Sequence, residues 1–216
     1  MSSFALKILA ILTMTIDHIG FLLFPQLTWL RAIGRLAFPI FAFQIGIGFR
    51  NTKNKKKYIV RMLLFAIISQ IPYHLALQAA IPGYPIRINI GATLTCGLLA
   101  LYCLENINKK WLKYVFTTFI ILLGTYIHMD YGSLGILMII VLYYFEIDKI
   151  FSTIFYIVVV ISDCLIDNST FSIPQIFALI PMFLYNGKKG KNIKYLFYAY
   201  YPLHLIILVL LKKFAI

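Results

Sequence analysis

Charged residues are scarce in this chain: only 12% of its 216 residues are Asp, Glu, Lys or Arg, and only 7 of them are acidic. A soluble domain of this size needs a far more polar surface, so the scarcity excludes an ordinary soluble protein. The 3 cysteines, Cys96, Cys103 and Cys164, form no CxxC motif, which favours small packing residues over a disulfide or metal site. A Gly-rich loop of the kind that cradles pyrophosphate is also missing.

Hydrophobic residues make up 62% of the chain, and they come in long runs. A helix that crosses a bilayer needs about 20 mostly apolar residues. Several runs approach this length, which predicts an all-α, polytopic transmembrane helical bundle of about nine spans. We expect residues 1–216 to form a single integral membrane domain. The expected spans lie at about 5–24, 31–49, 58–79, 88–104, 112–128, 133–147, 150–166, 172–185 and 195–211.

Basic residues give the chain a net charge of +13, and most of them lie in short runs between the apolar segments. The runs RNTKNKKK, NKKWLK and NGKKGKNIK follow the second, fourth and eighth segments. Because Lys and Arg are retained in cytoplasmic loops, this pattern predicts a cytoplasmic N-terminus in a bacterial-type inner or plasma membrane. No basic face alternates with aromatic residues in a soluble segment, so the expected partner is the lipid bilayer and not nucleic acid.

Ionisable side chains inside the apolar segments are the candidates for chemistry, because inserting each one costs about 2.5–3.5 kcal/mol. Asp17 in the first segment and Arg35 in the second lie at similar depth and are expected to pair. His18 lies about 100° from Asp17 around the helix, so the two side chains face different neighbours. A neutral imidazole near these groups is suited to act as a general base in acyl transfer. A purely structural ion pair is an equal alternative.

A second group of polar residues lies in the predicted outer half of the membrane: Gln70, His74, Asn89 and Asp130. Polar residues near the interface are more often solvated or hydrogen-bonded than catalytic, so a structural role competes with substrate binding. His128 and Asp130 flank one turn, but two ligands do not make a metal site, and no metal is expected.

Several blocks of the sequence carry a resemblance to a known family. In chain order they read LKILAILTMTIDHIGFLLFP, IGRLAFPIFAFQIGIGFRNT, KYIVRMLLFAIISQIPYHLA, RINIGATLTCGLLALY, MDYGSLGILMI and YLFYAYYPLHLIIL. Together they cover most of the chain and resemble the TraX family of conjugal-transfer-type membrane proteins, related in activity to pilin N-acetylation. The residues that match the family's polar positions are Asp17, His18, Arg35, Arg50, Tyr58, Arg61, Gln70, Asn89, Asp130, Tyr131, Tyr201 and His204.

The resemblance implies a membrane-embedded acetyltransferase that takes its acetyl group from cytoplasmic acetyl-CoA, the co-substrate. The acceptor is an amine or hydroxyl at a site within or beyond the bilayer. From their chemistry and depth we expect catalytic roles for His18, Asp17 and Arg35.

Two sets of binding residues are expected around this centre. Acetyl-CoA is anionic, and the residues expected to bind it are Arg50, Lys53, Arg61, Tyr201 and His204. The acceptor is a peptide, glycan or small molecule, and its expected binding residues are Gln70, His74, Asn89, Asp130 and Tyr131.

Two other functions stay open. Intramembrane Asp, His and Arg residues also mark proton relays, so a proton-coupled transporter or lipid flippase is the first alternative. A non-enzymatic partner in a membrane assembly is the second, and it predicts that the ionisable residues can be replaced without loss of function. The sequence leaves open whether the chain forms a homo-oligomer.

Overall fold

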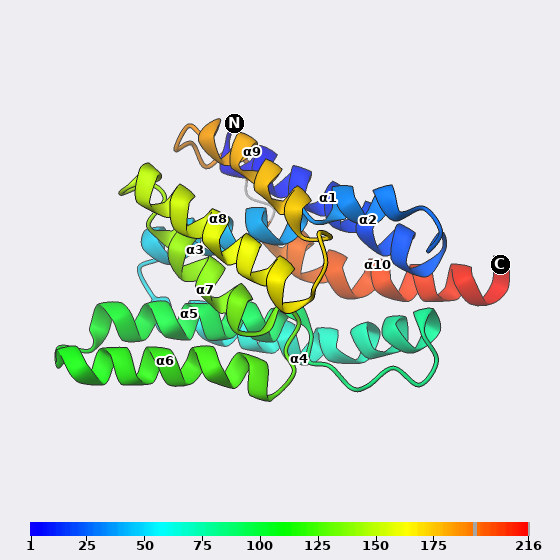
Figure 1. The fold of residues 1–216 in the computed structure, drawn as a ribbon, viewed down its shortest axis with the longest axis horizontal. Helices are drawn as coiled ribbons and strands as arrows, with labels where there is room; N and C mark the ends of the chain where they lie inside the picture. Colours follow the sequence, from blue (N-terminus) through cyan, green and yellow to red (C-terminus); the bar gives the residue numbers. More distant parts are fainter. Residues whose placement is uncertain (192–193, 216) are drawn as a thin grey trace. The chain divides into compact units, whose positions relative to one another are not determined.

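The structure, a computed structural model, describes residues 1–191 and 194–215, and helices dominate this part of the chain. Within it, the β pairing is limited to an isolated bridge between Ile88 and Met129. The expected all-α fold is confirmed (Figure 1). The helices are α1 (Ser3–Leu22), α2 (Thr28–Gly34), α3 (Ala37–Asn51), α4 (Lys55–Ala80), α5 (Ile90–Asn106), α6 (Lys110–Tyr126), α7 (Gly132–Tyr143), α8 (Lys149–Ile166), the 3₁₀ helix η1 (Ile173–Ala178), α9 (Leu179–Phe183) and α10 (Lys194–Ala215).

Each of the apolar segments expected from the sequence contains a helix, but two segments are interrupted. The second divides at Arg35 and Leu36 into α2 and α3. Pro39 lies in the first turn of α3, where a missing N–H removes no helical hydrogen bond, so a new helix can begin just before it. The eighth segment begins as η1, with Pro174 at its start, and continues as the short α9.

Five helical segments in the described part of the chain are long and apolar enough to cross a membrane. They are Ser3–Leu22, Thr28–Asn51, Lys55–Ala80, Lys149–Ile166 and Leu196–Phe214. Shorter apolar helices cover Ile90–Asn106, Gly132–Tyr143 and Ile173–Phe183. Large apolar side chains such as Ile71 (72% exposed) and Leu165 (75% exposed) stand on the outside of these helices, as lipid contact requires. The chain is a multi-pass helical membrane protein.

The chain forms two compact units. Unit 1 contains Met1–Gln44, Ile71–Pro85 and Val160–Ile216, and unit 2 contains Ile45–Gln70 and Ile86–Val159. The helices α3, α4 and α8 each contribute one part to each unit. The single domain over 1–216 that the sequence suggested stays a prediction.

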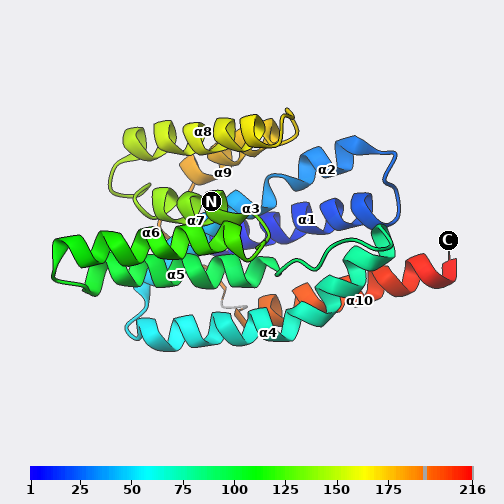
Figure 2. The same ribbon diagram turned by 60° about the horizontal axis from the view of Figure 1, so that its bottom comes forward.

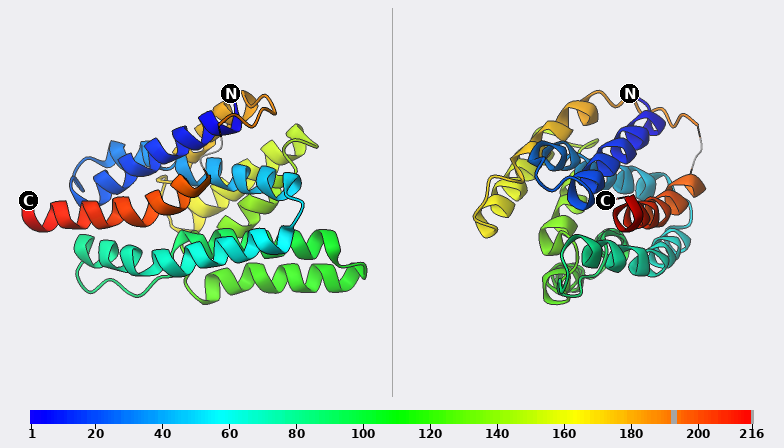
Figure 3. Two further views of the ribbon diagram at one scale, coloured as in Figure 1. Left: turned by 180° about the vertical axis from the view of Figure 1, so that it is seen from behind. Right: turned by 90° about the vertical axis from the view of Figure 1, so that its right-hand side faces the viewer.

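In unit 1, α1 packs against both α2 and α10. Both views of Figure 3 show α10 (red) running beside α1 (blue). The first residues of the chain lie against the loop before α10, because Ser3 N–H donates to the Lys188 carbonyl at 2.8 Å and Phe4 N–H to the Lys189 carbonyl at 3.1 Å. Inside the unit, the buried Ser3 hydroxyl donates to the Gln44 side chain at 2.6 Å.

In unit 2, the helices α5, α6 and α7 pack against one another, and α5 and α6 lie side by side in Figures 1 and 2. Buried apolar residues fill the space between them, among them Cys96, Ala100 and Ile136. Cys96 is a free thiol in this packing, as are Cys103 and Cys164 elsewhere. This core is apolar, while the buried polar side chains Ser69 on α4 and Thr117 on α6 belong to the same unit.

Candidate active site

The ionisable cluster of unit 1 is built around Asp17, which lies on α1 five residues before that helix ends at Leu22. Arg31 Nε lies 3.1 Å from Asp17 Oδ1, and Arg35 Nη2 lies 3.7 Å from the same atom. The expected pairing of Asp17 with Arg35 is therefore present, and Arg31 joins it. Only 15–21% of each of these three side chains is exposed, so the charges are largely removed from solvent and depend on one another.

The short turn between α1 and α2 places both arginines against this carboxylate. Arg31 is one helical turn before Arg35, so both side chains leave α2 and its end on the face towards α1. Phe171, in the loop before η1, lies across the guanidinium groups, with its ring centroid 4.6 Å from Arg35 Cζ and 5.8 Å from Arg31 Cζ. A ring face at this distance attracts a cation and shields it from water.

His18 faces a different helix from Asp17, as the 100° step around α1 predicts. Its Nδ1 lies 2.8 Å from Nε2 of His204 on α10. The other ring nitrogen of His204, Nδ1, lies 2.9 Å from the Tyr200 carbonyl oxygen. Within the described residues the histidine is thus linked to α10, while the neighbouring carboxylate is linked to the α2 arginines.

Tyr200 packs against His204 and also contacts α1. Its ring is stacked on the His204 ring, with centroids 5.0 Å apart and an angle of 13° between the planes. Its hydroxyl lies 2.7 Å from the Thr15 hydroxyl on α1. Since Thr15 and His18 are one turn apart, as are Tyr200 and His204, α1 and α10 are joined by polar contacts at two successive levels.

The expected acceptor-binding residues lie in both units. Gln70 and Asn89 bond each other in unit 2: Asn89 Nδ2 donates to Gln70 Oε1 at 2.7 Å and to the Ala66 carbonyl at 2.7 Å. Asn89 Oδ1 also accepts the Gly91 N–H at 2.8 Å, which caps α5. Asn89 is fully buried, and its amide is occupied by these contacts. The two residues hold α4 to the start of α5, and their role in substrate binding stays a prediction.

Asp130 and Tyr131 form the turn before α7 in unit 2. The Asp130 N–H donates to the Ile88 carbonyl at 2.8 Å, and its own carbonyl accepts the Thr93 hydroxyl. Tyr131 caps α7 with φ of 60°, a left-handed conformation that is uncommon outside glycine. His74 belongs to unit 1, where its Nδ1 is buried and makes no hydrogen bond within the described part of the chain.

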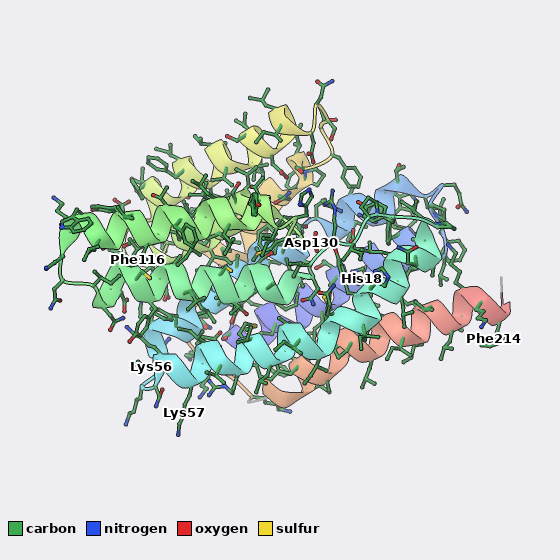
Figure 4. All side chains as sticks on the ribbon, turned by 90° about the horizontal axis from the view of Figure 1, so that it is seen from below. His18, Lys56, Lys57, Phe116, Asp130 and Phe214 are labelled. Atoms are coloured by element: carbon green, nitrogen blue, oxygen red, sulfur yellow. The ribbon has the colours of Figure 1, made fainter. Side chains whose placement is uncertain are left out.

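Of the five residues expected to bind acetyl-CoA, Tyr201 and His204 lie on α10 against His18, so their part in binding it stays a prediction. The three basic ones differ in exposure and in their partners. Arg50, at the end of α3, donates to the Tyr143 carbonyl and lies 3.5 Å from Glu146, so acidic and carbonyl oxygens already surround it. Lys53 is exposed, and Figure 4 shows Lys56 and Lys57 projecting outward from the start of α4. Arg61, further along α4, has a buried Nε without a hydrogen bond in the described residues.

A second acidic residue completes this end of unit 2. Glu105, near the end of α5, accepts from Lys55 at the start of α4 and from the Tyr143 hydroxyl at the end of α7. The ends of α3, α5 and α7 and the start of α4 therefore meet at one end of the unit. Gln70, Asn89, Thr93 and Asp130 meet at the opposite end.

Arg31, Thr15 and Tyr200 belong to this site but were not predicted from the sequence. Arg31 could have been predicted, because it lies four residues before Arg35 and residues four apart are neighbours on one helix face. Tyr200 had a similar signal in its spacing from His204. Nothing in the sequence joined His18 to His204, which lie 186 residues apart.

Comparison with known proteins agrees with the resemblance. The chain is 30% identical over 238 aligned residues to the probable fimbrial assembly protein FimC, serogroup H1, of Dichelobacter nodosus, which covers 99% of this chain and 96% of that protein. It is 28% identical over 139 residues to protein TraX of Escherichia coli, covering 64% of this chain and 54% of that protein. No solved structure matches the chain. The TraX protein family matches over residues 2–212, and the chain belongs to this family.

Proposed function

We propose that this protein is a membrane-embedded, acetyl-CoA-dependent acetyltransferase in which His18 is the general base. The observation that carries the proposal is the contact of the half-buried His18 with the buried His204, one residue from the Asp17 ion-pair cluster, in a chain of the TraX family. Such groups are costly within apolar helices and are retained where they perform chemistry or transport. The proposed acceptor is an amine or hydroxyl, in keeping with the fimbrial assembly role named for the Dichelobacter nodosus relative.

Acetyl-CoA supplies the acetyl group as an activated thioester. Three exposed lysines fit its phosphates by charge: Lys53, just before α4, and Lys56 and Lys57, in its first turn. Arg61 fits as well, because its buried Nε can donate to an anion. Arg50 is a weaker candidate, since Glu146 and the Tyr143 carbonyl already occupy its guanidinium. We assign Arg50 to holding α3 against the end of α7.

In the proposed reaction His18 accepts a proton from the acceptor amine while the amine nitrogen bonds to the acetyl carbonyl carbon. The carbon–sulfur bond breaks, and CoA leaves as a thiolate that takes up a proton. The imidazolium formed at His18 returns its proton to solvent or to the leaving thiolate. The Arg31 and Arg35 guanidiniums, held by Asp17, supply positive charge that would favour the oxyanion of the addition step.

We also propose a cytoplasmic N-terminus and nine spans. Unit 2 supports this arrangement, because the loop between α3 and α4 and the ends of α5 and α7 share one end. Unit 1 supports it too, because the first residues lie against the lysine-rich loop before α10. Loops at one end of alternating helices carry most of the Lys residues, as the positive-inside rule requires of the cytoplasmic side.

The test uses the full chain purified in lipid nanodiscs with radiolabelled acetyl-CoA. The acceptor probe is a synthetic peptide with a free N-terminal amine, and the same peptide with a blocked amine is the negative control. We expect label on the free peptide, and a fall of about 100-fold or more for His18→Ala. Leu12→Ala, a 55% exposed change on the same helix, should keep full activity. Undiminished transfer by folded His18→Ala would exclude His18 from the mechanism.

A proton-coupled transporter is the second candidate, and the chain of ring nitrogens from His18 to His204 is the observation that favours it. Proteoliposomes with an internal pH-sensitive dye separate the two functions. Proton flux without acetyl-CoA, lost in His18→Ala, would identify a transporter. Acetyl transfer without flux would support the enzyme.

A further inference from the structure

We infer that His204 is a positioning residue that holds His18 in the tautomer with a proton on Nδ1, which leaves Nε2 of His18 as the basic atom. The effect of this tautomer on catalysis rests on the proposed function, whereas the tautomer itself follows from the hydrogen bonds alone. The first of these bonds is to a backbone oxygen. The Tyr200 carbonyl lies 2.9 Å from His204 Nδ1, and a carbonyl only accepts hydrogen bonds, so His204 Nδ1 carries the proton.

The next hydrogen bond takes its direction from the first. A neutral imidazole has one donor nitrogen and one acceptor nitrogen, so His204 Nε2 is an acceptor once Nδ1 donates. His18 Nδ1 lies 2.8 Å from this acceptor and therefore donates to it. In a neutral His18 the lone pair is then on Nε2. Through two hydrogen bonds in series, the Tyr200 carbonyl thus determines which nitrogen of His18 carries the proton and which acts as the base.

The orientation of the His204 ring is itself fixed. Only 6% of His204 is exposed, and Tyr200 is stacked on its ring. The Thr15 hydroxyl donates to the Ile11 carbonyl at 2.8 Å, so it accepts from the Tyr200 hydroxyl at 2.7 Å. This bond holds Tyr200 to the helix that carries His18. The ring of Tyr201 adds an edge contact to both histidines, with centroids 6.1 Å from His18 and 5.6 Å from His204.

The contact of His18 with His204 resembles the contact of histidine with aspartate in Ser-His-Asp sites, with a different acceptor. In Ser-His-Asp sites a carboxylate accepts from the histidine Nδ1–H, fixes the tautomer and stabilises the imidazolium. Here Asp17 adjoins His18 in sequence, yet its carboxylate is paired with the arginines of the α2 segment. The neutral His204 takes the acceptor's place. When His18 gains a proton on Nε2, its Nδ1–H still points at the His204 lone pair, which stabilises the imidazolium.

Nitrogen NMR on the full chain in nanodiscs, labelled with ¹⁵N-histidine, tests the inference without any acceptor. The two nitrogens of a neutral imidazole differ strongly in shift, and His18→Gln identifies the His18 signals. We expect the wild-type His18 to carry its proton on Nδ1. In His204→Phe, which keeps an aromatic ring beside Tyr200 but has no acceptor, the proton should move to Nε2.

His204→Gln is the matched control, because its side-chain oxygen can accept from His18 Nδ1–H. With acetyl-CoA and the free-amine peptide, His204→Phe should lower kcat by about 100-fold and leave the KM for acetyl-CoA unchanged. The kcat of His204→Gln should be at least about 5-fold higher than that of His204→Phe. A wild-type His18 with its proton on Nε2 overturns the inference, whatever the activity. So does an unchanged tautomer in His204→Phe. If the tautomers behave as expected but the wild type transfers no acetyl group, only the proposed function fails.

Discussion

The side chain of Asp17 occupies the space that a side chain on Gly34 would need: a Cβ placed on Gly34 would lie only 2.5 Å from Asp17 Cγ. Glycine at this position therefore permits α2 to approach α1 so closely that Arg31 and Arg35 reach the carboxylate. The GRLAFP block that carries part of the family resemblance contains this glycine.

Gly34→Ala should destabilise the protein by about 1–3 kcal/mol, because the added methyl group must push Asp17 or α2 aside. Acetyl transfer should fall with it, since the ion-pair cluster loses its geometry. Thermal unfolding in detergent, followed by fluorescence or circular dichroism, measures the first effect. Ile33→Ala, at the exposed neighbouring position, is the control and should change the stability less. An alanine variant as stable as the wild type would contradict the close packing.

Asp17→Asn should be more damaging than Arg31→Gln or Arg35→Gln alone. The asparagine leaves two guanidiniums facing each other, whereas loss of one arginine leaves an ion pair in place. Breaking a largely buried pair costs about 3–5 kcal/mol. Combining Asp17→Asn with Arg31→Gln should restore part of the stability, which a double-mutant cycle on thermal unfolding detects. Strictly additive effects would show that the three charges act independently.

Asn89→Ala should cost about 3 kcal/mol in the free energy of unfolding. The change removes the cap of α5 and the side-chain amide that donates to the Ala66 carbonyl and to Gln70 Oε1, which keeps only the Asn89 backbone N–H at 3.0 Å. Arg87→Ala is a suitable comparison, because it keeps the backbone carbonyl that accepts from Gln70 Nε2 at 2.8 Å. Denaturant or thermal unfolding of both variants gives the difference, and equal losses would argue against Asn89 as the tie between α4 and α5.

Replacing Lys53, Lys56 and Lys57 together by Gln should raise the KM for acetyl-CoA several-fold with little change in kcat. These lysines are exposed and are proposed to attract the CoA phosphates, so the effect should shrink as salt is added. The matched control replaces Lys109, Lys110 and Lys113, which removes the same charge from the next basic loop. If both triple variants raise KM equally, the attraction is general and the α4 lysines form no particular site.

Single cysteines report on the proposed membrane orientation. In a chain in which Ser replaces Cys96, Cys103 and Cys164, a cysteine at Lys57 or Lys189 should react with an impermeant maleimide only in inside-out vesicles. A cysteine at Pro82 or Asn168 should react in right-side-out vesicles. The opposite pattern would reverse the orientation, and a Pro82 cysteine labelled from the same side as Lys57 would remove a span.

The helices were predictable from the sequence because hydrophobic runs of membrane length are a strong signal. The pairing of Asp17 with Arg35 was predictable too, because a short turn and equal depth leave a buried charge few choices. The division of the second segment into α2 and α3 was not foreseen, although Pro39 stood in the right place for a helix start. Both sides of the break belong to one hydrophobic run, so hydropathy alone does not mark it, and the close approach of Gly34 to Asp17 is visible only in the structure.

The contact between His18 and His204 was beyond the sequence for another reason. Each histidine was recognisable as an unusual residue in an apolar segment, but hydropathy carries no information on which distant helices touch. The contact depends on α10 lying beside α1, with Thr15 and Tyr200 one turn away. The hydrogen bond between Gln70 and Asn89 was not foreseen either, for the same reason, and their role in acceptor binding stays a prediction.

The burial of α5 in unit 2 has a consequence for biosynthesis. Most of its first three turns are buried, and its polar residues are tied to α4, α7 and the turn before α7. This helix has only 17 residues and contains Thr93, Thr95 and Glu105, so it enters lipid weakly on its own. Its retention in the membrane therefore depends on α6 and α7, which leave the ribosome after it. A chain that stops after α5 would expose this helix to the quality-control proteases of the membrane.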